Sequence, residues 1–139
     1  MAEGRVRALF VTPERKAKPV SLQSAVAAQG GFEGDYHSTK QTRRQILMVS
    51  GVVLDEFALQ AGALFENVTI DGVDVMQLNE GQQLRLGDAL VEVTVPCEPC
   101  IQMERVKQGL KEAVRDRRGM FVRVLLPGAV RVGDLVRVC

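Results

Sequence analysis

The sequence predicts a mostly β protein, a closed or nearly closed β-barrel that carries a few short helices. Short apolar segments recur along the chain, and several alternate between apolar and polar residues, as strands with one buried face do. Asp-Gly or Gly-Asp pairs follow or separate them at 71–72, 87–88 and 133–134, and such pairs favour tight turns. Many short strands joined by tight turns are typical of β-barrels.

The expected elements can be placed in order along the chain. Strands are predicted at 5–11, 45–49, 67–70, 83–86, 90–95, 121–126, 129–132 and 135–138. Residues 12–22 and 30–43 are rich in polar groups, proline or glycine, and we expect them to be irregular. Helical spacing at 52–61 ends at Gly62, and two short helices are expected at 100–107 and 110–117. No repeat or linker divides the chain, so we expect one domain over residues 1–139.

Composition limits the classes of function. The chain has 139 residues, enough to bury roughly two-thirds of its unfolded surface, so it can fold without disulfides or a structural metal. Lys plus Arg is 18 and Asp plus Glu is 17, and this balance argues against nucleic-acid or membrane-surface binding. No membrane-spanning run or signal-peptide core is found, so we expect a cytoplasmic protein. Three cysteines then indicate reactive or ligating thiols rather than a disulfide framework.

The most informative segment for chemistry is 95–101, Val-Pro-Cys-Glu-Pro-Cys-Ile. Pro99 suits the first position of the helix that follows, which would put Cys100 in the first turn, beside free N–H groups and the positive end of the helix dipole. Both favour the thiolate, the form that attacks electrophiles and binds metals. We therefore favour Cys100 over Cys97 as the functional thiol.

Cys97 and Cys100 also allow other interpretations. The pair can exchange disulfides or be buried as small apolar groups. A zinc site with Cys139 and the only histidine, His37, is a weak candidate because zinc needs four ligands.

Polar and basic groups elsewhere are candidates for ligand contact. Asp35 and His37, in the glycine-rich segment 31–37, can position a ligand or exchange a proton, or can belong to an ordinary surface loop. Glu66 and Asn67 open a strand, where structural hydrogen bonding is as good an explanation as ligand contact. Two basic clusters suit phosphate oxygens, although charge runs are also found on solvated faces. These clusters are Lys40, Arg43 and Arg44, and Arg115, Arg117 and Arg118.

Taken in order, these segments resemble the MOSC domain, the module at the C-terminus of molybdenum-cofactor sulfurases that also occurs as small stand-alone proteins. Each motif is weak alone, and the shared order makes the resemblance specific. It covers nearly the whole chain from Gly31, and the strand at 5–11 fits the opening strand of the family. The matching residues are Gly31 to His37, Arg44 to Leu47, Gly62 to Thr69, Leu78, Gly81, Leu84 to Asp88, Glu92 to Thr94, Pro99-Cys100, Gly119, Gly128 and Gly133-Asp134.

The resemblance implies a barrel of the pyruvate-kinase-barrel-like type and one functional cysteine, which falls on Cys100 by its Pro-Cys context. In the family that cysteine is thought to carry sulfur or to ligate molybdenum of a pterin cofactor (molybdopterin). Pyridoxal phosphate belongs to a separate domain of the fused sulfurases and is not expected within this chain. Cys97 is an additional thiol beyond the family's single cysteine. The chain is also too short for the N-terminal barrel of the amidoxime-reducing relatives, which argues against independent reductase activity.

Three functions follow as hypotheses. The first is a molybdenum-cofactor-binding or sulfur-carrier domain, partnered by a pterin-type cofactor, a sulfur-donor protein or a reductase, in which the Cys100 thiolate accepts sulfur as a persulfide or binds molybdenum. The second is a thiol–disulfide redox protein that uses Cys97 and Cys100. The third is a non-catalytic barrel that presents its pocket to a partner domain. In the first hypothesis Lys40, Arg43, Arg44, Arg117 and Arg118 hold the pterin phosphate, and Asp35, His37, Glu66 and Asn67 shape the pocket. Whether the chain is an enzyme by itself stays open.

Overall fold

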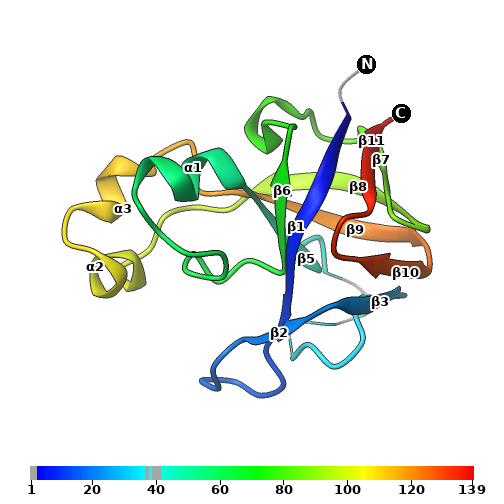
Figure 1. Cartoon of the computed structure of the whole chain (residues 1–139), viewed down its shortest axis with the longest axis horizontal. Helices are drawn as coiled ribbons and strands as arrows, with labels where there is room; N and C mark the ends of the chain where they lie inside the picture. Colours follow the sequence, from blue (N-terminus) through cyan, green and yellow to red (C-terminus); the bar gives the residue numbers. More distant parts are fainter. Residues whose placement is uncertain (1–2, 37, 39–41) are drawn as a thin grey trace.

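A computed structural model describes residues 3–36, 38 and 42–139 and shows a β-barrel from which a helical arm projects (Figure 1). Within these residues the barrel strands follow the order β11-β7-β8-β9-β5-β6-β1, and β1 pairs with β11 to close the circle. Their bounds are β1 (Glu3–Val11), β5 (Ile46–Ser50), β6 (Val68–Asp71), β7 (Gln83–Leu86), β8 (Ala89–Pro96), β9 (Met120–Leu126) and β11 (Leu135–Val138). The predicted closed barrel is therefore confirmed.

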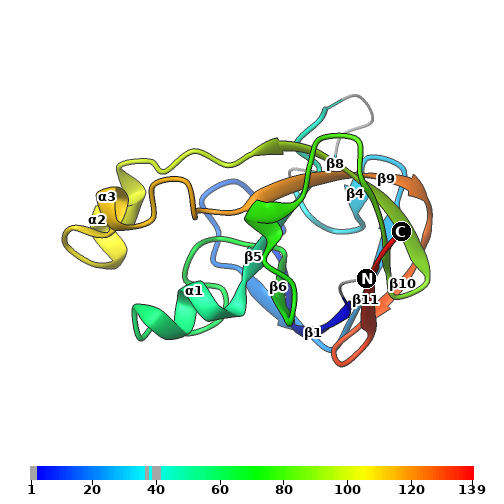
Figure 2. The same cartoon turned by 90° about the horizontal axis from the view of Figure 1, so that it is seen from above.

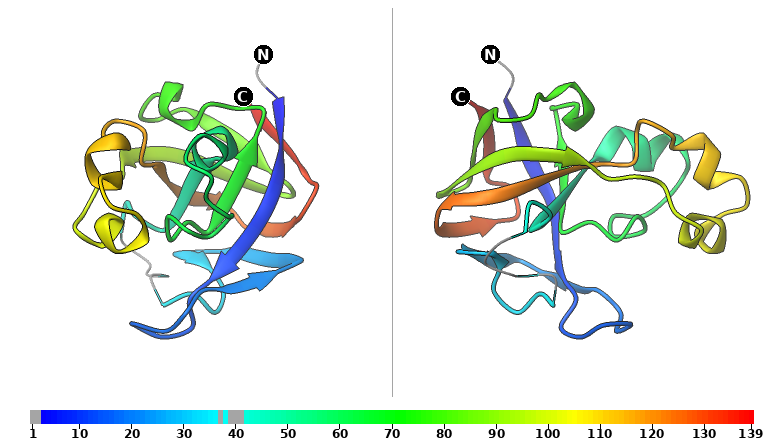
Figure 3. Two further views of the ribbon diagram at one scale, coloured as in Figure 1. Left: turned by 60° about the vertical axis from the view of Figure 1, so that its left-hand side comes forward. Right: turned by 180° about the vertical axis from the view of Figure 1, so that it is seen from behind.

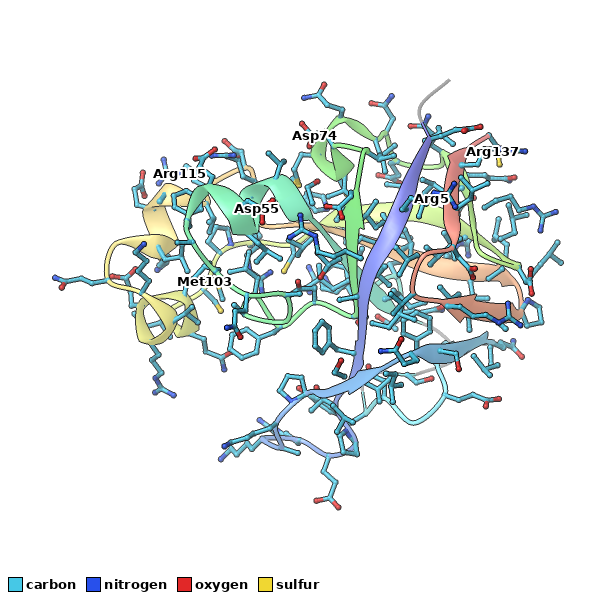
Figure 4. The ribbon with its side chains drawn as sticks, in the orientation of Figure 1. Arg5, Asp55, Asp74, Met103, Arg115 and Arg137 are labelled. Atoms are coloured by element: carbon cyan, nitrogen blue, oxygen red, sulfur yellow. The ribbon has the colours of Figure 1, made fainter. Side chains whose placement is uncertain are left out.

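The barrel is filled by the apolar residues that alternate along its strands. In β7 and β11 every second side chain is buried, and the others face solvent, as a pleated strand requires. Figure 4 labels Arg5 on β1 and Arg137 on β11, at the seam where the first and last strands pair. β5 differs because both of its faces are covered. Ile46 and Met48 belong to the barrel core, and Leu47 and Val49 belong to a second apolar cluster beneath the helices.

The helix α1 (Gly51–Glu56) carries the chain from β5 to β6, the parallel pair of the barrel. Parallel neighbours cannot be joined by a tight turn, so a crossover of this kind is required. The helix is shorter than the predicted 52–61, because Ala58 takes a positive φ of 55°. Arg7 fixes the helix to the barrel: its guanidinium donates to Asp55 at 2.9 Å and to Asp71 at 3.0 Å.

The helical arm, residues 97–119, connects the end of β8 to the start of β9 and extends away from the barrel (Figure 2). It contains α2 (Gln102–Val106) and α3 (Leu110–Ala113). The carboxylate of Glu104 accepts the backbone N–H groups of Gly109 and Lys111 at 3.0 and 2.9 Å, which fixes the turn between the two helices. Met103, labelled in Figure 4, is buried in the second apolar cluster and holds the arm against the barrel.

A smaller sheet and one additional strand lie in segments that the sequence analysis left irregular or unassigned. β2 (Val20–Leu22) extends the barrel sheet beside β1. β3 (Ser24–Ala28) pairs with β10 (Gly128–Arg131) and with β4 (Gly31–Phe32). The segments 12–22 and 30–43, which we expected to be irregular, therefore contain the strands β2 and β4. A short 3-10 helix, η1 (Val75–Gln77), precedes β7. None of the helices in the described part of the chain has the length and apolarity needed to span a bilayer.

Candidate functional site

The neck of the arm brings together residues that are distant in sequence. Pro96 on β8 is opposite Met120 on β9, so the residues just beyond them are also opposite each other. The backbone N–H of Cys97 donates to the carbonyl of Gly119 at 2.9 Å. Gly119 is needed at this position because a Cβ there would lie 2.7 Å from the carbonyl oxygen of Met48. This register places the side chains of Cys97 and Arg118 in the wall of one cavity.

That cavity, called here the Arg118 cavity, has a volume of about 350 Å³. It lies between the arm, the β1–β2 loop and the loop that precedes β6, segments that can be followed in the rear view of Figure 3. A volume of this size lies within the usual range for small-molecule sites. The described lining residues are Thr12, Ala17, Pro19, Tyr36, Arg44, Gln45, Leu47, Phe65, Asn67, Cys97, Gln102, Arg118 and Phe121.

Arg118 is the chemically unusual residue of the cavity. It is only 4% exposed, and its Nε and Nη1 atoms have no hydrogen-bond partner among the described residues. In that part of the chain these are the only buried side-chain nitrogen or oxygen atoms without one. An unpaired buried charge is costly, and proteins seldom keep one without a partner. The described lining contains a second arginine, Arg44, and no carboxylate, so the cavity favours an anion.

Two amide side chains of the wall are already engaged. Asn67 accepts the N–H of Leu47 at 3.0 Å through its side-chain oxygen and donates to the carbonyl of Phe10 at 3.1 Å. Gln45 accepts the N–H of Val124 at 2.9 Å and donates to the carbonyl of Thr42 at 3.1 Å. Both residues therefore fix the backbone of the wall. This engagement distinguishes the two amides from Arg118, whose buried Nε and Nη1 have no partner among the described residues.

Cys97 is the thiol that lines the Arg118 cavity, and it also borders a second cavity on the far side of the neck. It is a partly exposed free cysteine. Burial raises the pKa of its thiol above the ordinary value, and the positive charge of Arg118 opposes part of that rise. At neutral pH the thiol form therefore dominates, although Arg118 makes deprotonation of Cys97 easier than burial alone would allow.

Cys100 occupies a different position from the one we predicted. The helix α2 begins at Gln102, with Ile101 as its N-cap, so Pro99 is not the first helical residue and Cys100 is not in the first turn. The prediction was wrong because the chain stays irregular for longer after β8 than the position of the proline indicated. Cys100 is an exposed free thiol, and it is not part of the described lining of the Arg118 cavity.

The remaining predicted site residues divide into two groups. Arg44, Asn67 and Arg118 line the cavity. Asp35 is buried close to it, where its carboxylate accepts the N–H of Thr12 at 2.8 Å. His37 and Lys40 lie outside the described residues, so their predicted roles stay predictions.

The second group lies away from the cavity lining. Arg43 pairs with Glu80 at 2.7 Å on the barrel surface. Arg117 forms two bonds with Glu56, at 2.6 and 2.8 Å. Glu66 is buried, and its carboxylate accepts bonds from within its own turn and from the hydroxyl of Thr69. The structural alternative that the sequence left open for Glu66 agrees with this position.

Three aromatic residues of the cavity were not among the predicted site residues. Tyr36, Phe65 and Phe121 all line it, in a chain with one tyrosine, five phenylalanines and no tryptophan. Phe121 also faces the Arg44 guanidinium, whose carbon lies 6.0 Å from the ring centroid. Half of the aromatic residues of the chain therefore line one cavity, and no pattern in the sequence signals this, because the fold decides which side chains meet there. Among the described residues, no three His, Cys, Asp or Glu side chains come together as a metal site.

Comparison with known protein families identifies the fold and the family. The sequence matches the MOSC domain over residues 35–137, about three-quarters of the chain. The chain belongs to the MOSC domain family. This family is associated with the molybdenum cofactor, and the match includes the strands and the arm that form most of the Arg118 cavity. A search of curated proteins finds no match to the sequence.

Solved structures of three bacterial proteins share the architecture at low sequence identity. The YuaD protein from Bacillus subtilis is 21% identical, with a TM-score of 0.86, over 98% of this chain and 95% of that one. YiiM from Escherichia coli is 19% identical, with a TM-score of 0.72, over 97% and 69%. YiiM from Geobacillus stearothermophilus is 20% identical, with a TM-score of 0.70, over 98% and 73%. These likenesses establish the fold of this MOSC chain.

Proposed function

We propose that this MOSC protein binds a phosphate-bearing, pterin-type molybdenum cofactor in the Arg118 cavity. The observation that carries the proposal is the buried guanidinium of Arg118, whose Nε and Nη1 have no partner among the described residues. Arginine presents several N–H donors in a fixed fork that matches the oxygens of a phosphate. Arg44 adds a second cation at the same cavity. The family association with this cofactor and the fit of an oxyanion to Arg118 point to the same class of ligand.

The thiols define two versions of the chemistry. When bound, the cofactor would supply a molybdenum centre that accepts a thiolate ligand, and soft sulfur ligands suit such a centre. Cys97 lines the cavity directly, and Cys100, favoured by the sequence, is exposed on the same loop. In the alternative version one thiol carries sulfur as a persulfide. It attacks the outer sulfur of a persulfide on a sulfur-donor protein, and the donor's cysteine leaves as a thiol. A reductase is the corresponding partner if the bound centre undergoes redox chemistry.

The decisive experiment compares two single-charge variants. Wild type, Arg118→Gln and Arg43→Gln are expressed in cells that make the cofactor and purified. Pterin is measured by fluorescence after oxidative release, and molybdenum by mass spectrometry. Arg43 is the matched control, because it removes the same charge from a residue paired with Glu80 outside the cavity. We expect pterin to be lost from Arg118→Gln and kept by Arg43→Gln. Equal pterin recovery from wild type and Arg118→Gln would overturn the proposal.

The same preparation separates the two thiols. If a cysteine ligates molybdenum, its replacement by serine lowers the ratio of molybdenum to pterin and leaves the phosphate anchor in place. We expect this for Cys97→Ser or Cys100→Ser, with Cys139→Ser as the control, since Cys139 is exposed at the end of the chain. Molybdenum recovery equal to wild type with Cys100→Ser would exclude Cys100 as the ligand.

A second candidate function is thiol–disulfide exchange between Cys97 and Cys100. It is favoured by their positions: both are free, they share one irregular loop, and the Cys100 charge affects the pKa of Cys97. Alkylation and mass measurement across a series of glutathione redox buffers test it. A reversible loss of two alkylation sites, both in the 97–100 peptide, supports this function. If both cysteines stay open to alkylation in every glutathione buffer of the series, thiol–disulfide exchange is excluded.

A further inference from the structure

The loop before β6 holds Phe65 in a backbone conformation that bulky residues avoid. Its φ is 62°, in the left-handed region, which is uncommon outside glycine and a genuine outlier for a large side chain. Its ring is also 45% exposed. The strained backbone and the exposed apolar ring each reduce the stability of the folded protein, and both occur at Phe65. Such strain persists only where the surrounding structure enforces it, and it is concentrated at functional sites.

The enforcing structure is the turn around Glu66. The buried Glu66 carboxylate accepts the N–H of Gly62 at 3.0 Å, the N–H of Leu64 at 3.2 Å and the hydroxyl of Thr69 at 2.6 Å. Leu64 is completely buried in the second apolar cluster. Both neighbours of Phe65 are thus fixed, Leu64 by burial and Glu66 by hydrogen bonds. Phe65, held between them, lines the Arg118 cavity.

The other aromatic residues of the Arg118 cavity also suit a ligand with a flat ring. Phe121 and Tyr36 also line it, and an aromatic face can stack on any heteroaromatic base or fused ring system. The same cavity is lined by Arg118, which is buried and whose Nε and Nη1 have no partner among the described residues. A ligand that satisfies both features has a planar heteroaromatic ring and an anionic group on one molecule.

We propose that Phe65 is a specificity-determining residue that stacks on a planar heteroaromatic ring of the ligand, while Arg118 holds the phosphate of the same ligand. This inference rests on the proposed function and extends it. Arg118 selects for the anion, and Phe65 selects a flat ring over an aliphatic group. Glu66, which does not line the cavity, is the positioning residue that presents Phe65.

The test uses a fluorescent pterin carrying one phosphate group as the probe, with glycerol phosphate and inorganic phosphate as competitors. We expect wild type to bind the pterin phosphate more tightly than glycerol phosphate. Phe65→Gly should lower affinity for the pterin phosphate by about 5- to 150-fold, the range that one stacked ring contributes. Competition by inorganic phosphate should be unchanged. Because glycine accepts a positive φ, Phe65→Gly should keep or raise the melting temperature.

Further variants keep the test decisive. Phe65→Asn removes the ring but also tolerates the left-handed region, so it replaces the glycine variant if that turn loosens. Phe65→Tyr retains a stacking face and should bind as wild type does. Leu126→Asn is the surface control, since Leu126 is 50% exposed and is not among the lining residues. It should leave both affinities unchanged.

The outcomes separate this inference from the function on which it rests. If no phosphate compound binds wild type, or if Arg118→Gln binds inorganic phosphate as wild type does, both ideas fail. If Arg118→Gln loses phosphate binding while Phe65→Gly and Phe65→Asn bind the pterin phosphate as tightly as wild type, only the role of Phe65 is overturned.

Discussion

Arg117 and Arg118 are adjacent in the chain, yet the Arg117 guanidinium is bonded to a carboxylate, whereas two nitrogens of Arg118 have no partner among the described residues. Arg117 makes two bonds with Glu56 and lies 5.7 Å from the centroid of the Phe57 ring. Arg118 is buried in the wall of a cavity, with Nε and Nη1 unbonded among the described residues. Two residues of the same type and charge therefore have different surroundings and different hydrogen-bond partners. Arg117 attaches the arm to α1, whereas Arg118 is the residue that the proposed function assigns to a ligand.

The first prediction concerns the free-energy cost of burying Arg118 while Nε and Nη1 lack hydrogen-bond partners within the described part of the chain. Replacing Arg118 by methionine removes two buried N–H donors, Nε and Nη1, that have no partner among the described residues, and keeps an apolar stem. We expect the free energy of unfolding of the ligand-free protein to rise by about 1–3 kcal/mol, measured by urea denaturation. Arg117→Met should lower it instead, because it breaks the pair with Glu56. A less stable Arg118→Met protein would mean that the guanidinium has a structural partner.

The second prediction concerns the pH dependence of Cys97. Burial raises the pKa of this thiol above its ordinary value of 9.0, so its reactive thiolate increases with pH beyond that point. Modification of Cys97 by iodoacetamide, followed by peptide mass spectrometry, should therefore still accelerate above pH 9. Arg118→Gln removes a cation that lowers this pKa, and should shift the whole profile to higher pH.

Added phosphate provides an independent check of the same relationship. A phosphate bound to Arg118 offsets its charge, so it should slow modification of Cys97 in wild type and have no effect in Arg118→Gln. An identical pH profile in the two proteins would show that Arg118 does not influence the thiol.

The barrel was predictable because its strands follow a simple rule. β7, β8 and β11 alternate between the two faces, and Gly87-Asp88 and Gly133-Asp134 mark the turns. β3 was missed because Ser-Ala-Val-Ala-Ala is made mostly of small residues with little preference for strands. Its existence depends on pairing with β10, a contact between distant segments that no local pattern encodes.

The site was predictable in residue type more than in position. Arg118 and Arg44 belonged to basic clusters, but nothing local distinguished them from Arg117 and Arg43, whose partners come from remote segments. Cys97 reaches the cavity through the register of β8 and β9, which spacing in the sequence does not reveal. Phe65 gave no signal at all, because a phenylalanine is the last residue expected at a positive φ.

The third prediction tests Glu66 as the residue that positions Phe65. Glu66→Gln keeps the size of the side chain but turns one acceptor oxygen into an amide N–H₂ that faces other donors. We expect the free energy of unfolding to fall by about 1–3 kcal/mol for each buried donor left unpaired. Affinity for the pterin phosphate should fall as well, because the Phe65 ring is no longer fixed, while inorganic phosphate still competes normally.

The double variant distinguishes this role from general loosening of the protein. If Glu66 acts on the ligand only through Phe65, then Glu66→Gln should not weaken pterin phosphate binding further in a Phe65→Gly protein, although it still lowers stability. Thr69→Val, which removes one donor to the same carboxylate, serves as the milder companion variant and should show the same dependence on Phe65. Additive losses of pterin phosphate affinity in Phe65→Gly/Glu66→Gln would instead mean that the carboxylate affects the cavity by another route, since interacting residues show non-additive effects and independent ones add.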